Sequence, residues 1–399
     1  METIVDDNSC VGCKACGDVC PRQAIDFPVD EEGFWHPQID SAKCIDCHRC
    51  QRICPVLKLP ARQQTNAEQP KVYATYHKDH AIRCNSTSGG MYYALAENIL
   101  AKGGWLAGCV YTDDFDHAEH IVSNTPEGLQ RIMRSKYFQS DTQGIYLKVK
   151  ELLNQGELVL FCGAPCQVAA LYKFLGKEYE KLFTVDFICR GINTPLAYQS
   201  YMKELTEKYQ SPLREVRFKD KSKGWTKLGT KIIFANGTVY YRNRFNDPWV
   251  NGFIAGDIYM RRSCAKCHFK EFPRIADVTI GDFWGIPLTF DEEKYGLSLA
   301  MINNKKGQEL FSIAECSLVY RDEKLERAIA GNPALLHSAS ISTNREKFFQ
   351  LLKTKKYSEA VWETMNLAWP KWQIRTYYLQ LRDIVIGKLS RIKRRIKNE

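Results

Sequence analysis

The sequence lacks long hydrophobic runs. No stretch approaches 18 consecutive apolar residues, the length that crosses a bilayer as a helix. The first residues, Met-Glu-Thr-Ile-Val-Asp-Asp, also lack the basic and apolar regions of a secretory signal. We therefore expect no membrane-spanning helix and a location in the reducing cytoplasm, where cysteines bind metal rather than form disulfides.

The body of the chain also lacks a strong charge. The formal net charge is +10, but residues 371–399 hold nine Lys or Arg and two acidic residues, so the first 370 residues carry only about +3. A nucleic-acid binder needs a basic face on its folded body, so we expect no nucleic acid as a partner. The sequence also contains no paired carboxylates and no Ser-His-Asp order that would assign a catalytic residue.

Cysteine, by contrast, is abundant. Eight of the 16 cysteines lie in two runs, residues 10–21 and 44–55, and each run reads Cys-x2-Cys-x2-Cys-x3-Cys-Pro. In this bacterial ferredoxin spacing, three thiolates bind one 4Fe-4S cluster and the fourth binds the other. The predicted ligands are Cys10, Cys13, Cys16 and Cys54 for one cluster, and Cys44, Cys47, Cys50 and Cys20 for the other. Four disulfides or two zinc sites are less favoured, because zinc sites usually use paired Cys-x2-Cys hooks.

The pattern predicts an α+β ferredoxin-like domain, a linker and an α/β domain. The ferredoxin-like domain covers residues 1–58, and the polar, proline-bounded residues 59–70 form the linker. Beyond it, short apolar runs alternate with helical periodicity, which indicates a mostly parallel sheet. The expected strands are 72–76, 105–111, 158–162, 182–189 and 277–280, and the expected helices are 90–102, 144–154, 166–175, 195–209 and 249–261. A β-rich insertion at 216–241 contains the hairpin turn Ala235-Asn236-Gly237.

Four further cysteines are placed to meet. Cys166 starts a predicted helix, Cys189 ends the next predicted strand, and Cys264-x2-Cys267 is a two-ligand hook. Adjacent parallel strands would bring Cys166 and Cys189 to one sheet edge, and the hook would complete four thiolates for a third 4Fe-4S cluster. A structural zinc and unconnected buried cysteines are the alternatives. The role of Cys162 stays open.

Two turns precede helices and could expose backbone N–H groups to a phosphate. They are Ser86–Gly90 and Ser135–Ser140. Taken alone, helix capping without a ligand is the better interpretation of each.

Together these segments resemble the coenzyme F420 hydrogenase/dehydrogenase beta-subunit family. The matching motifs are Phe161-Cys-Gly-Ala-Pro-Cys-Gln167, Cys189-Arg-Gly191, Cys264-x2-Cys267, Arg274–Gly285, Ser88-Gly-Gly90 and Ser135-Lys-Tyr137. The resemblance spans residues 71–345, and the order of the motifs makes it specific. The residues within these motifs resemble most the bacterial members of the family that are associated with polysaccharide gene clusters.

The resemblance implies a flavoprotein that binds FAD and an additional iron–sulfur cluster. It implies Cys166, Cys189, Cys264 and Cys267 as the ligands of that cluster, and it places Ser88, Gly89, Gly90, Lys136 and Gln139 near the flavin. The implied function is an oxidoreductase that relays electrons between ferredoxin-type clusters and a flavin. That flavin would reduce or oxidise a hydride-accepting substrate, either coenzyme F420-like or a glycan-biosynthesis intermediate. The alternative is an electron-transfer subunit without its own substrate that docks on a partner enzyme. The implied partner is ferredoxin or an enzyme subunit.

Residues 346–399 are expected to form a helical tail. Apolar residues recur there at steps of three and four, opposite basic ones, at Ile374, Tyr378, Leu381, Val385, Leu389, Ile392 and Ile396. A basic amphipathic helix suits an anionic membrane surface, here the inner face of the membrane, or a partner protein. A solvated helix that packs on its own domain is an equal alternative.

Overall fold

The computed structural model describes residues 3–61 and 67–367, together with residues 374, 375, 377–379, 381, 382 and 385. Part of the predicted linker and most of the predicted amphipathic helix therefore lie outside the described residues. No helix in these described ranges is long and apolar enough to cross a membrane.

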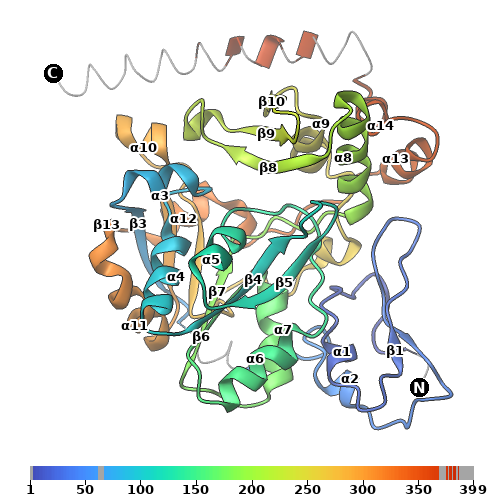
Figure 1. Cartoon of the computed structure of the whole chain (residues 1–399), viewed down its shortest axis with the longest axis vertical. Coiled ribbons are helices and arrows are strands. Elements are labelled where there is room, and N and C mark those ends of the chain that lie inside the picture. Colours follow the sequence, from blue (N-terminus) through green and yellow to red (C-terminus); the bar gives the residue numbers. More distant parts are fainter. Residues whose placement is uncertain are drawn as a thin grey trace.

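The N-terminal domain repeats one local structure. Helix α1 (Ala15–Asp18) lies in the first cysteine run and α2 (Arg49–Arg52) in the second. Each is preceded by a residue in the left-handed conformation, Lys14 or His48, both with φ 55°. The antiparallel strands β1 (Ile25–Asp26) and β2 (Gln38–Ile39) lie between the helices in the sequence. The sequence repeat thus has a structural counterpart, and this domain lies beside α7 (Figure 1).

The rest of the chain is built on an eight-stranded sheet of order β13-β3-β12-β11-β7-β6-β4-β5. Its strands are β3 (Lys71–His77), β4 (Trp105–Tyr111), β5 (Ala118–Ser123), β6 (Val159–Gly163), β7 (Leu182–Phe187), β11 (Val278–Asp282), β12 (Ser298–Ile302) and β13 (Leu318–Glu323). The four neighbours β11, β7, β6 and β4 run parallel, and the flanking pairs are antiparallel. Four of the five predicted strands therefore form the parallel centre of a mixed sheet, whereas the predicted strand 72–76 lies in β3 and pairs antiparallel with β12 and β13.

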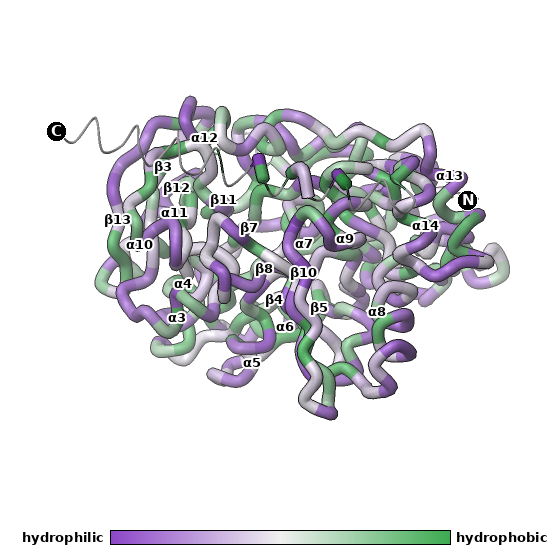
Figure 2. The backbone as a smooth tube through the Cα atoms, turned by 90° about the horizontal axis from the view of Figure 1, so that it is seen from above, coloured by the Kyte–Doolittle hydropathy of each residue, from purple (hydrophilic) through white to green (hydrophobic). Residues whose placement is uncertain are grey.

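Helices cover both faces of this sheet. Helices α4 (Met91–Ala101), α5 (Pro126–Ile132) and α11 (Lys305–Ala314) pack on one face, and α6 (Ile145–Asn154) and α7 (Pro165–Leu175) pack on the other. Because strands buried on both faces have no polar side, β6 carries the continuous apolar run Val-Leu-Phe. Seen from above, hydrophilic stretches follow much of the outer contour (Figure 2).

A second core lies above the large sheet in Figure 1. It combines the antiparallel strands β8 (Leu213–Asp220), β9 (Gly229–Phe234) and β10 (Val239–Asn243) with α8 (Pro195–Tyr209), α13 (Arg345–Leu352) and α14 (Tyr357–Thr364). The β9–β10 turn contains Gly237 with φ 84°, as the hairpin prediction requires. Phe348 and Trp362 are buried here, so α13 and α14 belong to this domain rather than to a separate tail.

The helix predicted over 249–261 is only partly present. Helix α9 (Pro248–Val250) continues as a π-helix, η3 (Asn251–Ala255), and the helical backbone then ends at Gly256. Asp257 follows with φ 48° in the left-handed region, which interrupts a helix. The remaining residues lead into the Cys264 hook.

Candidate redox site

The eight N-terminal cysteines divide into two groups of four. Cys10, Cys13, Cys16 and Cys54 line one cavity, and Cys20, Cys44, Cys47 and Cys50 line another. Each group takes three thiols from one run and the fourth from the other run, the crossed arrangement of a two-cluster ferredoxin. Their role as ligands stays a prediction, for which these thiols are suitably placed.

The four later cysteines also meet around one cavity. Cys166 lies in the first turn of α7, and Cys189 lies just after β7. The 3-10 helix η4 (Arg262–Lys266) and the residue after it supply Cys264 and Cys267. Because β6 and β7 are adjacent and parallel, their carboxyl ends lie at the same sheet edge, which is where Cys166 and Cys189 were expected to meet.

The surroundings of these thiols suit iron–sulfur clusters. One thiol in each group accepts a backbone N–H: Gly12 N lies 3.4 Å from Cys10 Sγ, Ala24 N 3.3 Å from Cys20 Sγ, and Ile192 N 3.3 Å from Cys264 Sγ. Such hydrogen bonds to sulfur tune these clusters. Burial raises the pKa of Cys13 and of Cys189 to about 12, so their thiolates need a bound cation.

The thiols surround cavities rather than a single point. In the described part of the chain, no three His, Cys, Asp or Glu side chains are placed to hold a single metal ion. A 4Fe-4S cube instead takes one thiolate at each of four irons, so its ligands can stand further apart. The four thiols of each cavity match that number.

The cavities form a connected series. Val11 lines both the cavity of Cys10 and that of Cys166. Cys189, Gly191 and Ile192 line the latter cavity and also a large one, whose volume is about 550 Å³. The N-terminal domain is thus joined through the third cysteine group to the large cavity.

The large cavity opens at the carboxyl ends of the central parallel strands. Gly163 from β6, Phe187 from β7 and Gly281 from β11 line it. Ligands of α/β sheets bind at this edge. Its walls are rich in aromatic rings, which are Tyr92, Tyr93, Tyr137, Phe138, Phe187, Phe218, Trp225, Trp249, Phe253 and Trp284. The rings of Trp225 and Trp284 stack with centroids 4.2 Å apart. This size and these flat apolar walls suit a flavin.

Four of the five residues predicted near a flavin line this cavity, namely Ser88, Gly90, Lys136 and Gln139. The side chain of Lys136 has a structural role as well, because its Nζ donates to three carbonyl groups at the end of α5. Burial lowers the pKa of Lys136 to about 8. Lys136 therefore caps a helix C-terminus beside the cavity.

Gly89 does not line the cavity but supports it from behind. Its backbone N–H donates to Ser298 Oγ over 2.8 Å. A Cβ at this position would lie 2.5 Å from the carbonyl oxygen of Thr75 and 2.7 Å from the backbone nitrogen of Ser298. Because both atoms belong to strands, neither can move aside easily. Gly89 thus lets the Ser88 turn lie against the sheet.

We expect Gly89→Ala to lower the free energy of unfolding by about 1–3 kcal/mol, the range for overpacking in a close-packed interior. Gly156→Ala is the control, because its Cβ would meet open space and only the left-handed φ of 81° opposes it. That change should cost about 1–2 kcal/mol, the cost of a residue with a Cβ in the left-handed region. Anaerobic urea unfolding compares the two, and a greater loss at Gly156 would contradict the packing argument.

Arg261 joins the N-terminal domain to the rest of the chain. Its guanidinium is buried and donates to the carbonyl oxygens of Cys10 over 2.6 Å and Trp35 over 3.0 Å. It also donates to Gln139 Oε1 over 3.0 Å, while Gln139 Nε2 donates to the carbonyl of Gly12 over 3.2 Å. The amide group of Gln139, predicted near a flavin, thus bonds at the domain junction.

Sequence reasoning missed Arg261 and a group of basic residues beside the large cavity. Nothing in the sequence distinguishes Arg261 from Arg262. The basic group had a signal, since Lys219, Lys221 and Lys223 alternate at the end of β8. Alternation of this kind places side chains on one face of an extended chain.

Comparison with known proteins first gives the class of protein. Residues 9–57 match the 4Fe-4S dicluster domain, which makes the chain an iron–sulfur protein. Residues 156–326 match the family described as the C terminus of the coenzyme F420 hydrogenase/dehydrogenase beta subunit. Two segments of the chain thus match known families: residues 156–326 match the family that the resemblance predicted, and residues 9–57 match the dicluster domain.

Among solved structures, a chain from the F420-reducing NiFe hydrogenase complex of Methanosarcina barkeri is similar to this one. The identity is 18%, the TM-score is 0.46, and the similarity covers 75% of this chain and 92% of that chain. A comparison with curated proteins gave no match.

Proposed function

We propose that this chain is an iron–sulfur flavoprotein oxidoreductase with three 4Fe-4S clusters and one FAD. The observation that carries the proposal is the connected series of two four-cysteine cavities and one large cavity, joined by Val11 and Cys189, with a further four-cysteine cavity in the N-terminal domain. A series of this kind suits the passage of electrons between a site for a small molecule and the surface of the N-terminal domain.

Each cofactor has a set of candidate residues. The two crossed groups of N-terminal cysteines would hold two clusters, and Cys166, Cys189, Cys264 and Cys267 would hold the third. The large cavity would hold FAD beside Ser88, Gly90 and Lys136, with Gly89 supporting the turn. A bound flavin exchanges hydride with a substrate and single electrons with clusters.

Side chains beside the third cysteine group hold its backbone in position and offset the negative charge of its thiolates. Lys270 is buried, and its Nζ donates to the carbonyl oxygens of Cys189 over 2.5 Å and Ala334 over 3.1 Å. This cation stabilises negative charge on the nearby thiolates. Gly191 lies where the third cysteine cavity and the large cavity meet, and a Cβ there would lie 2.6 Å from Met260 Sδ.

A hydride-accepting substrate would enter the large cavity. The family match suggests coenzyme F420-like compounds as substrates. The resemblance to bacterial members suggests a glycan-biosynthesis intermediate instead. We assign no catalytic residue, because no side chain of the cavity is marked by its position as a proton donor to such a substrate.

The second candidate function is an electron-transfer subunit without its own substrate. Apolar side chains on the N-terminal domain favour it, because Val29, Ile45 and Leu57 are exposed by 64%, 59% and 51%. Ile45 follows Cys44 in the sequence and lines the cavity of Cys20, Cys44, Cys47 and Cys50. A redox partner, either an enzyme subunit or ferredoxin, could dock there under either function.

Anaerobic purification with iron, sulfide and flavin measured together tests the proposal. We expect about twelve irons and one FAD per chain, from four irons per cube. The variant Cys264→Ser/Cys267→Ser should lose about four irons. Cys316→Ser is the control, because Cys316 is exposed and lines none of the three cysteine cavities, and it should lose none.

About eight irons without flavin in the unmodified protein would refute the oxidoreductase. Full cofactor content without reduction of any small molecule would instead support the electron-transfer subunit. The substrates to try are coenzyme F420 and unsaturated sugar derivatives.

A further inference from the structure

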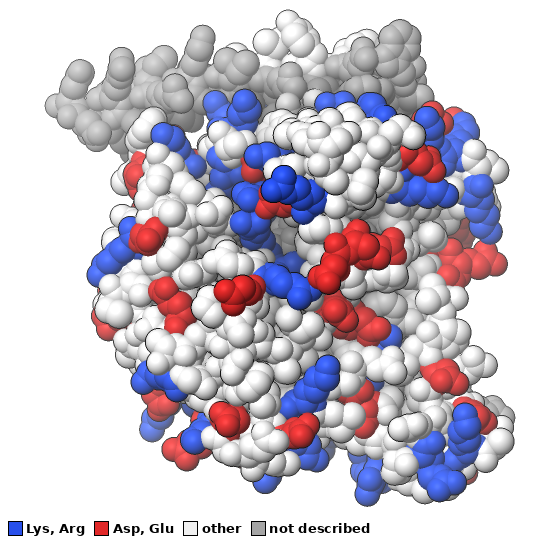
Figure 3. Space-filling model, viewed as in Figure 1, with Lys and Arg blue, Asp and Glu red and all other residues white. Residues whose placement is uncertain are grey.

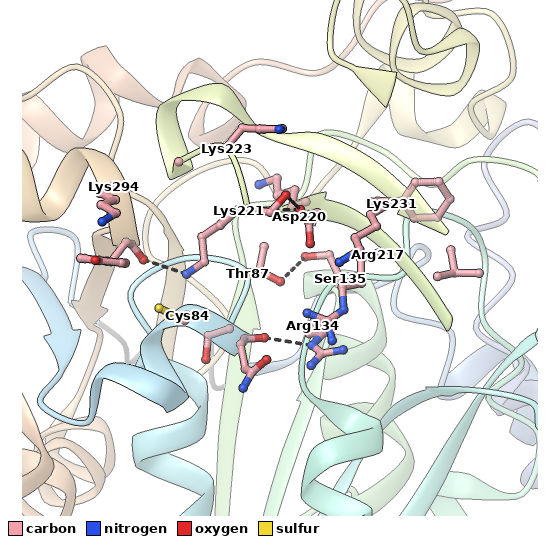
Figure 4. Close-up of a pocket in the computed structure, with 18 residues that line it drawn as sticks. Cys84, Thr87, Arg134, Ser135, Arg217, Asp220, Lys221, Lys223, Lys231 and Lys294 are labelled. Carbon is pink, nitrogen blue, oxygen red and sulfur yellow. Dashed lines mark hydrogen bonds between the residues drawn. The ribbon is translucent and has the colours of Figure 1, made fainter. Parts of the chain in front are cut away.

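A basic pocket adjoins the large cavity. Its volume is about 560 Å³, and it lies between α3 (His80–Asn85), the loop after α5, and strand β8 with its following loop. Among its described lining residues are seven cations and one carboxylate, which are Arg134, Arg217, Lys219, Lys221, Lys223, Lys231, Lys294 and Asp220. Figure 4 labels all of these side chains except that of Lys219, and Lys and Arg gather beside a hollow in Figure 3.

Two of the cations are available to a ligand. The side chains of Lys223 and Lys231 form no hydrogen bond and no ion pair with other residues in the described ranges. Lys223 and Lys294 are exposed at the pocket rim, whereas Lys231 is half-buried. The amino group of Lys294 lies 4.8 Å from the ring centre of Tyr295. The positive charges of Lys223 and Lys231 are therefore not cancelled by another side chain in the described ranges.

The two arginines are held in place by one acid. Glu215 Oε1 accepts from Arg134 Nη1 over 2.8 Å and from Arg217 Nε over 2.5 Å. Arg134 has φ 76°, an unusual conformation for a residue with a Cβ. Since one carboxylate faces two guanidinium groups, the pair keeps a net positive charge.

The deeper lysines connect the pocket to the proposed flavin site. Lys221 Nζ donates to the carbonyl oxygens of Ser88 over 2.6 Å and Tyr295 over 2.8 Å. Lys219 pairs with Asp282, which lines the large cavity. Residues shared by the two cavities are Ser86, Thr87, Arg134, Ser135, Phe218 and Lys219. One molecule can therefore extend from the basic pocket into the large cavity.

We propose that the basic pocket binds the phosphate or diphosphate group of the substrate whose reducible part lies in the large cavity. This inference rests on the proposed oxidoreductase function. Lysines and arginines from separate segments, together with the hydroxyls of Thr87, Ser135 and Ser222, offer donors from several directions. A tetrahedral oxyanion uses donors in that arrangement, whereas a planar carboxylate is served by one guanidinium.

The diphosphate of the flavin is the other source of such a group. The exposed rim lysines favour an exchangeable ligand, because a resident cofactor is normally enclosed. The two sources predict different binding of pyrophosphate when FAD already occupies the large cavity. A substrate group binds in the presence of FAD, and the flavin's own diphosphate excludes added pyrophosphate.

The test is a calorimetric titration of inorganic pyrophosphate into the full chain, purified anaerobically with its iron and FAD, at low ionic strength. We expect stoichiometric binding, with weaker binding of inorganic phosphate at the same site. Lys223→Gln/Lys231→Gln should weaken pyrophosphate binding about tenfold or more, since hydrogen bonds to charged groups are strong. Lys227→Gln, in the same loop but outside both cavities, should leave binding unchanged.

Three results would overturn the proposal. They are no binding by the FAD-loaded protein, equal binding by the double variant, and binding that appears only after FAD is removed. The iron content of each variant verifies that it is folded, since neither Lys223 nor Lys231 has a partner in the described ranges whose loss would disturb the fold. Iron and flavin contents measured on the same samples report separately on the oxidoreductase function.

Discussion

Arg261→Met should lower the free energy of unfolding by about 3–5 kcal/mol, because it leaves three buried acceptors without this donor. The guanidinium is 1% exposed and donates to the carbonyl oxygens of Cys10 and Trp35 and to Gln139. Methionine fills much of the same volume but donates nothing. Each buried acceptor left unsatisfied costs about 1–3 kcal/mol.

Two measurements check this result under anaerobic conditions. Urea unfolding gives the loss of stability, and hydrogen exchange gives its location, which should be the loop that holds Cys10 and Gly12. Arg262→Met is the matched control, because its side chain is 44% exposed and forms one ion pair, 2.8 Å from Glu32. Exposed pairs contribute about 0–1 kcal/mol. Similar losses for both arginines would contradict a special role for Arg261 at the domain junction.

Local spacing explains why the cysteine groups could be predicted. In the N-terminal runs, thiols three residues apart share a tight loop, and the left-handed Lys14 and His48 repeat that loop in both halves. The third group depends on one further step, the parallel pairing of β6 and β7. That pairing follows from the alternation of strands and helices, so Cys166 and Cys189 could be placed at one edge before the structure was known.

Contacts between distant segments explain what could not be predicted. The flanking strands β5, β12 and β13 pair antiparallel, and short apolar runs do not reveal their direction. Arg261 bonds to Cys10, 251 positions earlier in the chain. Lys136 follows a serine before a helix, which suggests a phosphate contact, but its amino group lies on the carbonyl end of the preceding helix. Strand direction and the partners of these side chains are visible only in the folded structure.

Arg274→Met is the second substitution with a large expected effect, again about 3–5 kcal/mol in the free energy of unfolding. Arg274 Nη2 lies 3.1 Å from Asp186 Oδ2, and the two side chains are 2% and 0% exposed. The substitution leaves the Asp186 carboxylate buried without this cation. Asp186→Leu/Arg274→Met removes both charges and should recover most of the loss, since a buried ion pair is often replaceable by apolar groups.

The loss of stability caused by Arg274→Met should depend on pH. Burial raises the pKa of Asp186 above its usual value, while Arg274 opposes that rise. Without Arg274 the folded-state pKa rises further, so the unfolded chain releases its proton at lower pH than the folded one. Stability of Arg274→Met should therefore fall as pH rises above about 4, the pKa of Asp in an unfolded chain, and the double variant should not show this slope.

Urea unfolding across that pH range measures both effects, and iron content measures the consequence for the third cysteine group. Arg274 Nη1 also donates to the carbonyl of Phe269 over 2.8 Å, two residues after Cys267. That contact gives Arg274 a second way to position the hook. Equal losses in the single and double variants, without a pH slope, would show that Arg274 acts through Phe269 rather than through Asp186.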